Sequence, residues 1–214
     1  PSGKFLLDKH HDVDRPPTTV IRRASEGGVV ATVQRASLKP PLATLPAAER
    51  IVATAADGKT QMHGVLYKPV GFDPAKRYPV IERIYGGMQL NVAPRGFPAL
   101  NQDEYDQMLL YFASRGFVVV MLDAPGTLGR GRDYSLARYG TWPDGIIADH
   151  AAGLRGVAKA RPWMDLTRVG LDGNSFGGML ALRGALEAPD LYRAVAASVP
   201  QTDLIDSVSW IEWK

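Results

Sequence analysis

The 214-residue sequence predicts an α/β fold whose mostly parallel sheet carries helices on both faces. From Arg50 onward, short apolar runs alternate with segments whose apolar residues recur at helical spacing. Strands separated by helices are typical of right-handed crossovers between parallel strands. The run FVVVMLD at residues 117–123 is continuously apolar, as expected for a strand that is buried on both faces. The composition, 45% hydrophobic and 22% charged residues, is that of a globular protein.

The first part of the chain is typical of antiparallel β structure. Residues 18–37 contain two β-branched runs around Gly27 and Gly28, and glycine permits the positive φ that a tight hairpin needs. A lone hairpin is marginal in water, so this one must belong to a larger sheet. Prolines between residues 39 and 46 then favour an extended connector. We expect a β segment over 1–38, a linker over 39–49 and an α/β domain over 50–214.

The α/β part begins with an antiparallel pair, because residues 50–69 contain two strand-like runs around an Asp57-Gly58 turn. The remaining elements alternate along the chain. Strands are expected within YPVIERIYGG (78–87), FVVVMLD (117–123), RVGLDGN (168–174) and AVAASVP (194–200), and helices within residues 103–116, 144–160 and 176–188.

Composition excludes several classes of function. Zero cysteines exclude disulfides, thiolate catalysis and cysteine-ligated metals, and they do not distinguish cytoplasm from periplasm. The net charge of +3 comes from scattered arginines and lysines without a basic stripe, so we expect no nucleic-acid partner. No apolar stretch is long enough to span a bilayer, so we expect no membrane partner. The histidines have no carboxylates at ligand spacing, and we expect neither a metal nor a cofactor.

The stretch RVGLDGNSFGGMLAL contains the five-residue pattern GxSxG over residues 173–177. In that pattern the serine is a nucleophile if it lies on a sharp turn between a strand and a helix. Apolar residues precede it and helix formers follow it, so the context fits. Gly173 and Gly177 let strand and helix approach, and Ser175 would lie at a helix N-terminus, where an oxyanion is stabilised. The alternative is a glycine-rich crossing with a structural serine.

Residues 50–206 resemble the α/β-hydrolase domain of the prolyl oligopeptidase family of serine peptidases, nearer its dipeptidyl peptidase IV and acylaminoacyl peptidase branches. Residues 1–38 are similar to the end of the β-propeller that precedes the hydrolase domain in these enzymes. The resemblance rests on stretches that occur in the family's order, namely VLYKP, YPVIERIYGG, RGFVVVMLDAPGTLGRGRDY, ADHAAGLRGVAKARPWMD, RVGLDGNSFGGMLAL and APDLYRAVAASVP.

The resemblance implies catalytic roles for Ser175, Tyr85 and Phe176. Ser175 would be the nucleophile, while the backbone N–H of Phe176 and the hydroxyl of Tyr85 would stabilise the oxyanion. Tyr85 and the ring of Phe176 would also bind substrate, next to the residue before the scissile bond. The alternative for Tyr85 is that it caps the core. The dipeptidyl peptidase branch usually has Trp and Tyr on either side of the serine, so Asn174 and Phe176 argue against strict proline specificity.

The family places its catalytic Asp and His after the elbow, yet residues 176–214 contain no histidine. The four histidines, His10, His11, His63 and His150, all precede Ser175, and we expect structural roles for them. We therefore expect an incomplete serine hydrolase, a fragment whose Asp and His lie outside this sequence. Its last strand would be an open edge through which copies could associate.

Three functions remain open. The first is a serine peptidase that hydrolyses short peptides and releases dipeptides or short acyl-peptides. The second is a carboxylesterase-type α/β-hydrolase, and the third is a non-catalytic fragment. Tyr85 and the N-terminal hairpin favour the peptidase, since esterases often have HGGG where this chain has YGGM.

Overall fold

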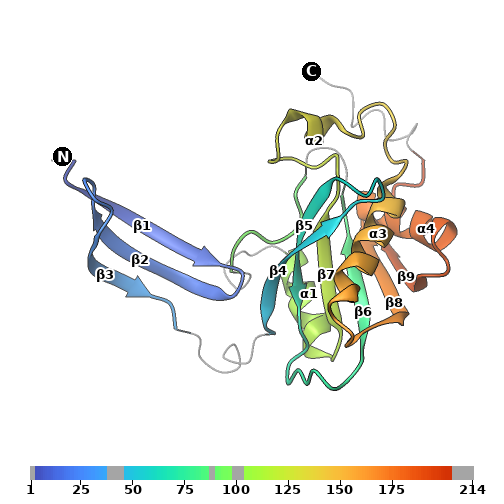
Figure 1. Ribbon diagram of the computed structural model, residues 1–214, viewed down its shortest axis with the longest axis horizontal. Coiled ribbons are helices and arrows are strands. Elements are labelled where there is room, and N and C mark those ends of the chain that lie inside the picture. The colour runs from blue at the N-terminus through green and yellow to red at the C-terminus, as the bar shows by residue number, and fades with distance from the viewer. Residues whose placement is uncertain (1–2, 38–45, 87–89, 98–103, 204–214) are drawn as a thin grey trace.

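The computed structural model describes residues 3–37, 46–86, 90–97 and 104–203 (Figure 1). No helix among these residues has both the length and the apolar character needed to cross a membrane. The elements in chain order are β1 (Phe5–Asp12), β2 (Arg15–Arg23), β3 (Val29–Arg35), β4 (Ala48–Thr54), β5 (Gln61–Tyr67), β6 (Tyr78–Ile84), α1 (Glu104–Ser114), β7 (Val118–Asp123), α2 (Arg132–Leu136), α3 (Ile146–Lys159), β8 (Met164–Asn174), α4 (Phe176–Glu187) and β9 (Tyr192–Ser198).

The N-terminal segment is a three-stranded antiparallel sheet in the order β1-β2-β3, which extends away from the rest of the chain (Figure 1). The predicted hairpin is confirmed as β2 and β3, with Gly27 at φ 70° in the turn. Strand β1 was not predicted, because FLLDKHHD contains no β-branched residue and pairs through its backbone.

The large sheet has the order β4-β5-β7-β6-β8-β9. Strands β6 to β9 run parallel to their neighbours in that group, whereas β4 and β5 are antiparallel, as the Asp57-Gly58 turn predicts. The α/β fold with a mostly parallel sheet is therefore confirmed. Strand β4, the first strand of this sheet in the chain, begins at Ala48. Within the described residues, β9 lies at one edge of this sheet.

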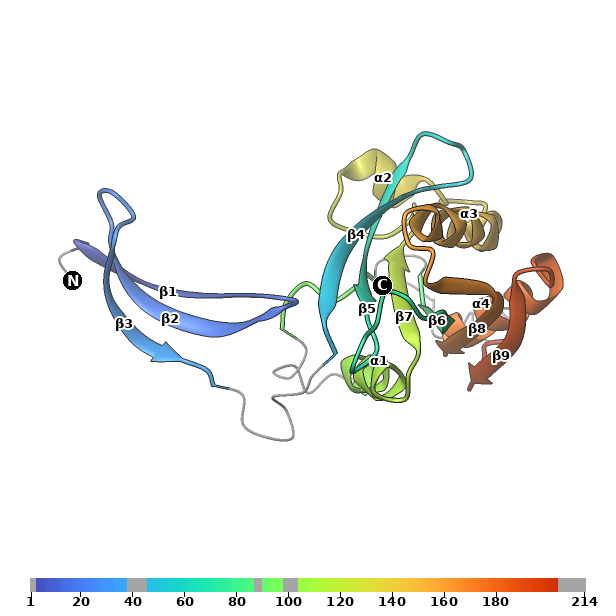
Figure 2. The same ribbon diagram turned by 60° about the horizontal axis from the view of Figure 1, so that its bottom comes forward.

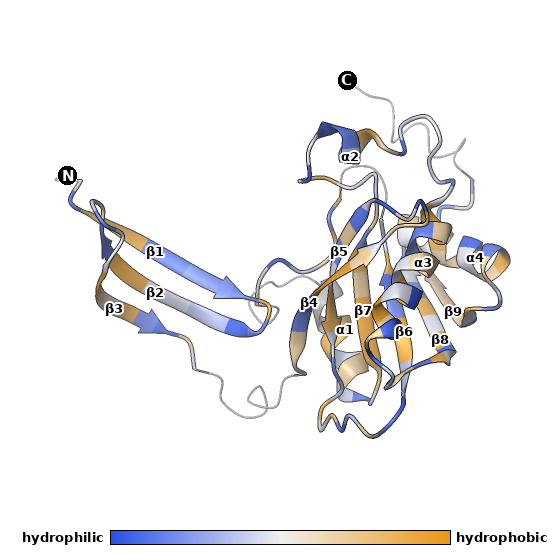
Figure 3. Ribbon diagram, viewed as in Figure 1, coloured by the Kyte–Doolittle hydropathy of each residue, from blue (hydrophilic) through white to orange (hydrophobic). Residues whose placement is uncertain are grey.

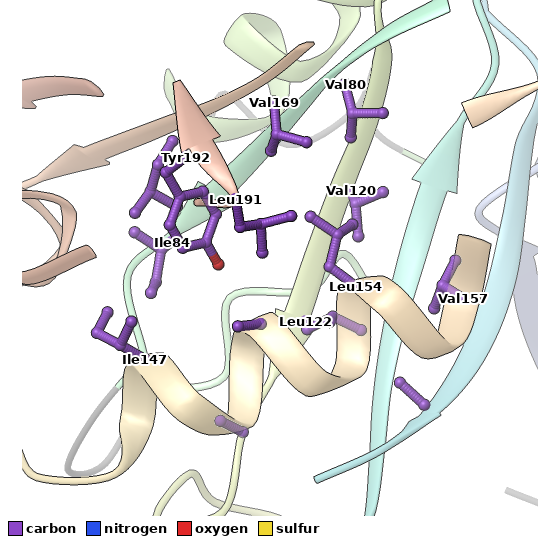
Figure 4. Packing of buried hydrophobic residues seen from close by; sticks show 14 of the residues in the cluster. Val80, Ile84, Val120, Leu122, Ile147, Leu154, Val157, Val169, Leu191 and Tyr192 are labelled. Carbon is purple, nitrogen blue, oxygen red and sulfur yellow. The ribbon is translucent and has the colours of Figure 1, made fainter. Parts of the chain in front are cut away.

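Helices pack on both faces of the sheet, with α1 on one face and α3 and α4 on the other (Figure 2). The buried strand β7 shows why. Val118, Val120 and Leu122 pack with residues of α3 and α4, while Val119 and Met121 pack against α1. Figure 4 shows the first of these layers, and Figure 3 shows apolar residues concentrated on the strands of the large sheet. The continuously apolar sequence of β7 follows from burial on both faces.

Candidate active site

Ser175 lies on the turn between β8 and α4, where the sequence predicts a nucleophile elbow. Its backbone has φ 59° and ψ −119°, a conformation that costs a residue with a side chain about 1–3 kcal/mol. The N–H of Ser175 donates to the carbonyl of Ser198 at the end of β9, at 2.9 Å. Its side chain is half-buried. The surrounding strands therefore hold Ser175 in a strained turn at the carboxyl edge of the parallel sheet.

Glycines make this turn possible because backbone occupies the space beside them. A Cβ on Gly177 would lie 2.2 Å from the carbonyl oxygen of Ile84 and 2.9 Å from the Cα of Tyr85. A Cβ on Gly173 would lie 2.0 Å from the carbonyl oxygen of Gly177. The first turn of α4 therefore packs directly against the end of β6. This contact brings the chain at Tyr85 next to the turn that carries Ser175.

Tyr85 and Phe176 flank this contact. Tyr85 is half-buried and follows β6, whose last residue, Ile84, is the register partner of Gly173 in β8. Phe176 is the first residue of α4, where backbone N–H groups lack intrahelical acceptors and the helix dipole favours negative charge. Both residues therefore lie at the sheet edge where α/β folds build their sites. The role of the Tyr85 hydroxyl stays a prediction.

An aromatic pair includes Phe176, the residue that follows Ser175. The ring of Trp142 packs edge-to-face against the ring of Phe176, with centroids 5.2 Å apart and an interplanar angle of 88°. The indole Nε1 of Trp142 is buried and has no hydrogen-bond partner among the described residues. The sequence did not predict this contact of Trp142. The available signal was a large aromatic residue in the polar, glycine-containing loop GTWPDG at residues 140–145.

A buried polar network lies under the segment that carries Tyr85. His150 Nδ1 is 2.8 Å from Glu82 Oε1, and the Tyr192 hydroxyl donates to Glu82 Oε2 at 2.8 Å. Glu82 and His150 are fully buried, and burial together with the charge of Glu82 raises the pKa of Tyr192. A Cβ on Gly86 would lie 3.5 Å from His150 Nε2. Through Glu82, His150 and Tyr192, this network connects β6, α3 and β9, which fits the structural role expected for His150.

The other histidines lie away from the elbow. His63 is half-buried in β5, and its pKa is lowered by burial and by the positive charge of Arg130. His11 Nδ1 accepts a hydrogen bond from the backbone N–H of Phe97 at 3.1 Å, and His10 lies beside Asp8. In the described part of the chain, no hydrogen bond joins Ser175 to any histidine.

Comparisons with known proteins identify similar sequences and folds. The prolyl oligopeptidase family model matches residues 103–213, which include Ser175. Mouse dipeptidyl peptidase 8 is 33% identical over 141 residues, covering 66% of this chain and 15% of that protein. A crystal structure from Bacteroides ovatus matches with a TM-score of 0.74 and 29% identity over 89% of this chain and 26% of the other. Dipeptidyl peptidase 4 of Porphyromonas gingivalis has the same fold, with a TM-score of 0.72. It is 21% identical, and the match covers 94% of this chain and 28% of that one.

Proposed function

Because the chain belongs to the prolyl oligopeptidase family, we propose that it is part of a serine peptidase that hydrolyses short peptides through an acyl-enzyme on Ser175. The observation that carries this proposal is the strained turn of Ser175 at the N-terminus of α4, packed against the end of β6. The chain spans 15% of mouse dipeptidyl peptidase 8 and 26% of the Bacteroides ovatus structure, and the activity is proposed for a longer protein that contains it.

In this proposal the Ser175 hydroxyl attacks the carbonyl carbon of a peptide bond, and the carbonyl oxygen becomes an oxyanion. The backbone N–H of Phe176 and the Tyr85 hydroxyl donate hydrogen bonds to that oxygen. The amine leaves with a proton, and water then hydrolyses the ester on Ser175. The strained turn serves this chemistry because it holds the hydroxyl clear of its own strand and helix.

The base and the acid of this mechanism come from residues outside the 214. Two observations support this part of the proposal. No histidine follows Ser175 in the sequence, and the four that precede it make no hydrogen bond to Ser175 in the described residues. The family order, Ser then Asp then His, is consistent with both partners lying farther along the chain.

The N-terminal sheet is proposed to be the end of a β-propeller that limits access to short peptides. Its three antiparallel strands leave most of β1 and all of β3 exposed, as expected for strands that pack against further β structure. Arg50 of β4 forms an ion pair with Asp12 at 2.7 Å, which connects the end of this sheet to the α/β part. The carboxylesterase and the non-catalytic fragment are the alternatives that the following experiment distinguishes.

We predict that the full-length protein is labelled by a fluorophosphonate at Ser175 and cleaves an Xaa-Pro or Xaa-Ala dipeptidyl anilide. Ser175→Ala should abolish both, since the acyl-enzyme cannot form. The 214-residue chain alone should do neither, because a serine hydroxyl without a base attacks poorly. Labelling is measured by mass spectrometry and cleavage by anilide release.

Each alternative has its own outcome in this experiment. An esterase would turn over a p-nitrophenyl acyl ester and leave the dipeptidyl anilide intact. A full-length protein that neither labels nor cleaves would establish the non-catalytic reading. If the 214-residue chain labels as fast as the full-length protein, the base lies within it, and His150 and His63 are the first to replace.

We predict that Tyr85→Phe in the full-length protein lowers kcat by about 10²- to 10³-fold, because one oxyanion donor is lost. The change removes only an oxygen, so the melting temperature should stay near that of the wild type. Steady-state kinetics with the dipeptidyl anilide measure the effect. Tyr111→Phe on α1 is a matched control on an exposed tyrosine. A wild-type kcat in Tyr85→Phe would show that this tyrosine only caps the core.

A further inference from the structure

A polar cavity lies at the edge of the sheet where β7 ends, next to the junction with the N-terminal segment. Its volume is about 220 Å³, and it opens between β4, β5 and the loop at residues 93–95. Five charged or titratable side chains line it, Arg50, His63, Arg95, Asp123 and Arg130. His63 and Asp123 are register partners on β5 and β7, so the cavity covers the ends of adjacent strands.

Among the described residues that line the cavity, the carboxylate of Asp123 is the only one, and it already accepts hydrogen bonds. Asp123 is 3% exposed, and its Oδ1 accepts hydrogen bonds from the backbone N–H groups of Val92 and Ala93 at 2.8 and 3.1 Å. Its Oδ2 accepts a third from Asn91 Nδ2 at 3.2 Å. Asp123 therefore holds the loop that closes the cavity, and its charge is stabilised by that loop.

The three arginines of the cavity differ in their interactions. Arg50 already has partners, because it forms an ion pair with Asp12 at 2.7 Å and donates a hydrogen bond to the carbonyl of Arg95 at 2.8 Å. Arg95 and Arg130 are both exposed, and no acidic side chain in the described ranges forms an ion pair with either. A Cβ on Gly129 would lie 2.8 Å from Arg95 Nη2, so Arg95 lies against the loop that carries Arg130. Two guanidinium groups without carboxylate partners thus share one cavity.

The pKa of His63 depends on the charges around this cavity. Its pKa is lowered first by burial and then by the positive charge of Arg130, while Asp123 acts in the opposite direction. Arg50 and Arg95 line the same cavity. The carboxylate of Asp123 therefore does not neutralise all the arginines that line the cavity, and the electrostatic potential there favours an anion.

We propose that this cavity binds a single oxyanion group, a carboxylate or a phosphate, between the guanidinium groups of Arg95 and Arg130. Guanidinium groups match both anions with paired, charge-assisted hydrogen bonds. The volume is below the roughly 300–1,000 Å³ of pockets for drug-sized ligands, so it fits one terminal group and not a whole ligand.

Two sources could supply such a group, the C-terminal carboxylate of a peptide at Ser175 or a free small anion. The cavity opens at β5, which is separated from β8 by β7 and β6. Three inter-strand spacings amount to about 14 Å, which an extended peptide covers in about four residues. A short peptide whose scissile bond lies at Ser175 could therefore place its carboxylate here. This source rests on the proposed function, whereas the free anion does not.

The test uses full-length protein with Ser175→Ala, so that peptides remain intact. Binding of inorganic phosphate, a short peptide with a free C-terminus and the same peptide as its amide is measured by calorimetry. We expect phosphate to bind, the free acid to bind at least tenfold more tightly than the amide, and Arg95→Gln with Arg130→Gln to abolish both effects. Arg155→Gln on α3, an exposed arginine paired with Asp190, is the matched control.

An NMR titration gives a second readout. A bound anion stabilises the protonated imidazole, so the pKa of His63 should rise on ligand binding and stay unchanged in the double variant. If phosphate binds while acid and amide bind equally, the site holds and its ligand is a free anion. If the double variant binds all three probes as the control does, the proposal is wrong. Hydrolysis plays no part, so a failed peptidase proposal shows separately, in the labelling experiment.

Discussion

At the scale of single residues, the candidate site depends on where side chains are absent. The glycine spacing around Ser175 indicated a sharp turn, and the positive φ at Ser175 confirms it. The reason is local, because strand, turn and helix are adjacent in sequence. The contact between Glu82 and His150 could not be predicted this way, since 68 residues separate them. A glutamate within the apolar run of β6 was the available signal, and it indicated a buried partner without identifying it.

We predict that Gly177→Ala destabilises the α/β part by about 1–3 kcal/mol, the usual cost of overpacking. The added Cβ would meet the carbonyl oxygen of Ile84, so either α4 or the end of β6 must shift. The shift moves Ser175 relative to Tyr85, and fluorophosphonate labelling of the full-length protein should slow with it. Urea unfolding and labelling rates measure the two effects.

Gly156→Ala on α3 is the matched control, because a Cβ there meets nothing within 4 Å. Alanine is the better helix former, so this variant should be as stable as the wild type or more stable. Equal stability of the two variants would show that α4 and β6 have room to separate.

At the scale of elements, side-chain hydrogen bonds of Asp165 add to the backbone pairing at the beginning of β8. Asp165 accepts hydrogen bonds from the Thr167 hydroxyl at 2.7 Å and from Arg168 Nε at 2.8 Å, and Arg77 adds a third contact at 3.2 Å. These interactions lower the pKa of Asp165 from 3.8 to about 2. The sequence predicted a strand from residue 168, and the structure begins it at Met164, which is already the register partner of Tyr78 in β6.

We predict a stability loss at acid pH that depends on Asp165. Its folded pKa lies below the ordinary value, so the unfolded state binds more protons between pH 4 and pH 2. The stabilisation is complete above about pH 4 and disappears as the pH falls to about 2. Asp165→Asn should therefore show a shallower loss of unfolding free energy over this range, as measured by urea unfolding at several pH values.

The control for this prediction is Asp133→Asn on α2, an exposed residue with no ion pair in the described part of the chain. It removes one charge without removing the contacts at β8. A wild-type slope in Asp165→Asn would mean that other carboxylates set the acid transition.

At the scale of the whole molecule, the class of the fold followed from the alternation of strands and helices, whereas the order of the strands did not. Strand β7 lies between β5 and β6 although it follows both in sequence. Apolar runs determine which strands are buried on both faces, and they carry no information on which strand lies beside which. The Arg-lined cavity was missed for the same reason, because Arg50, Arg95 and Arg130 belong to three separate segments.

The pairing of β6 with β8 also affects the order of events when the chain folds. The partners Arg83 and Asp172 are 89 residues apart, and α1, β7 and α3 lie between them. Contacts this distant form after local structure, because closing a long loop costs entropy before any contact compensates for it. The elbow at Ser175 depends on β6 and on Ser198 of β9. A partly folded or newly synthesised chain would therefore lack the strained turn at Ser175, and the proposed activity would arise only when folding is nearly complete.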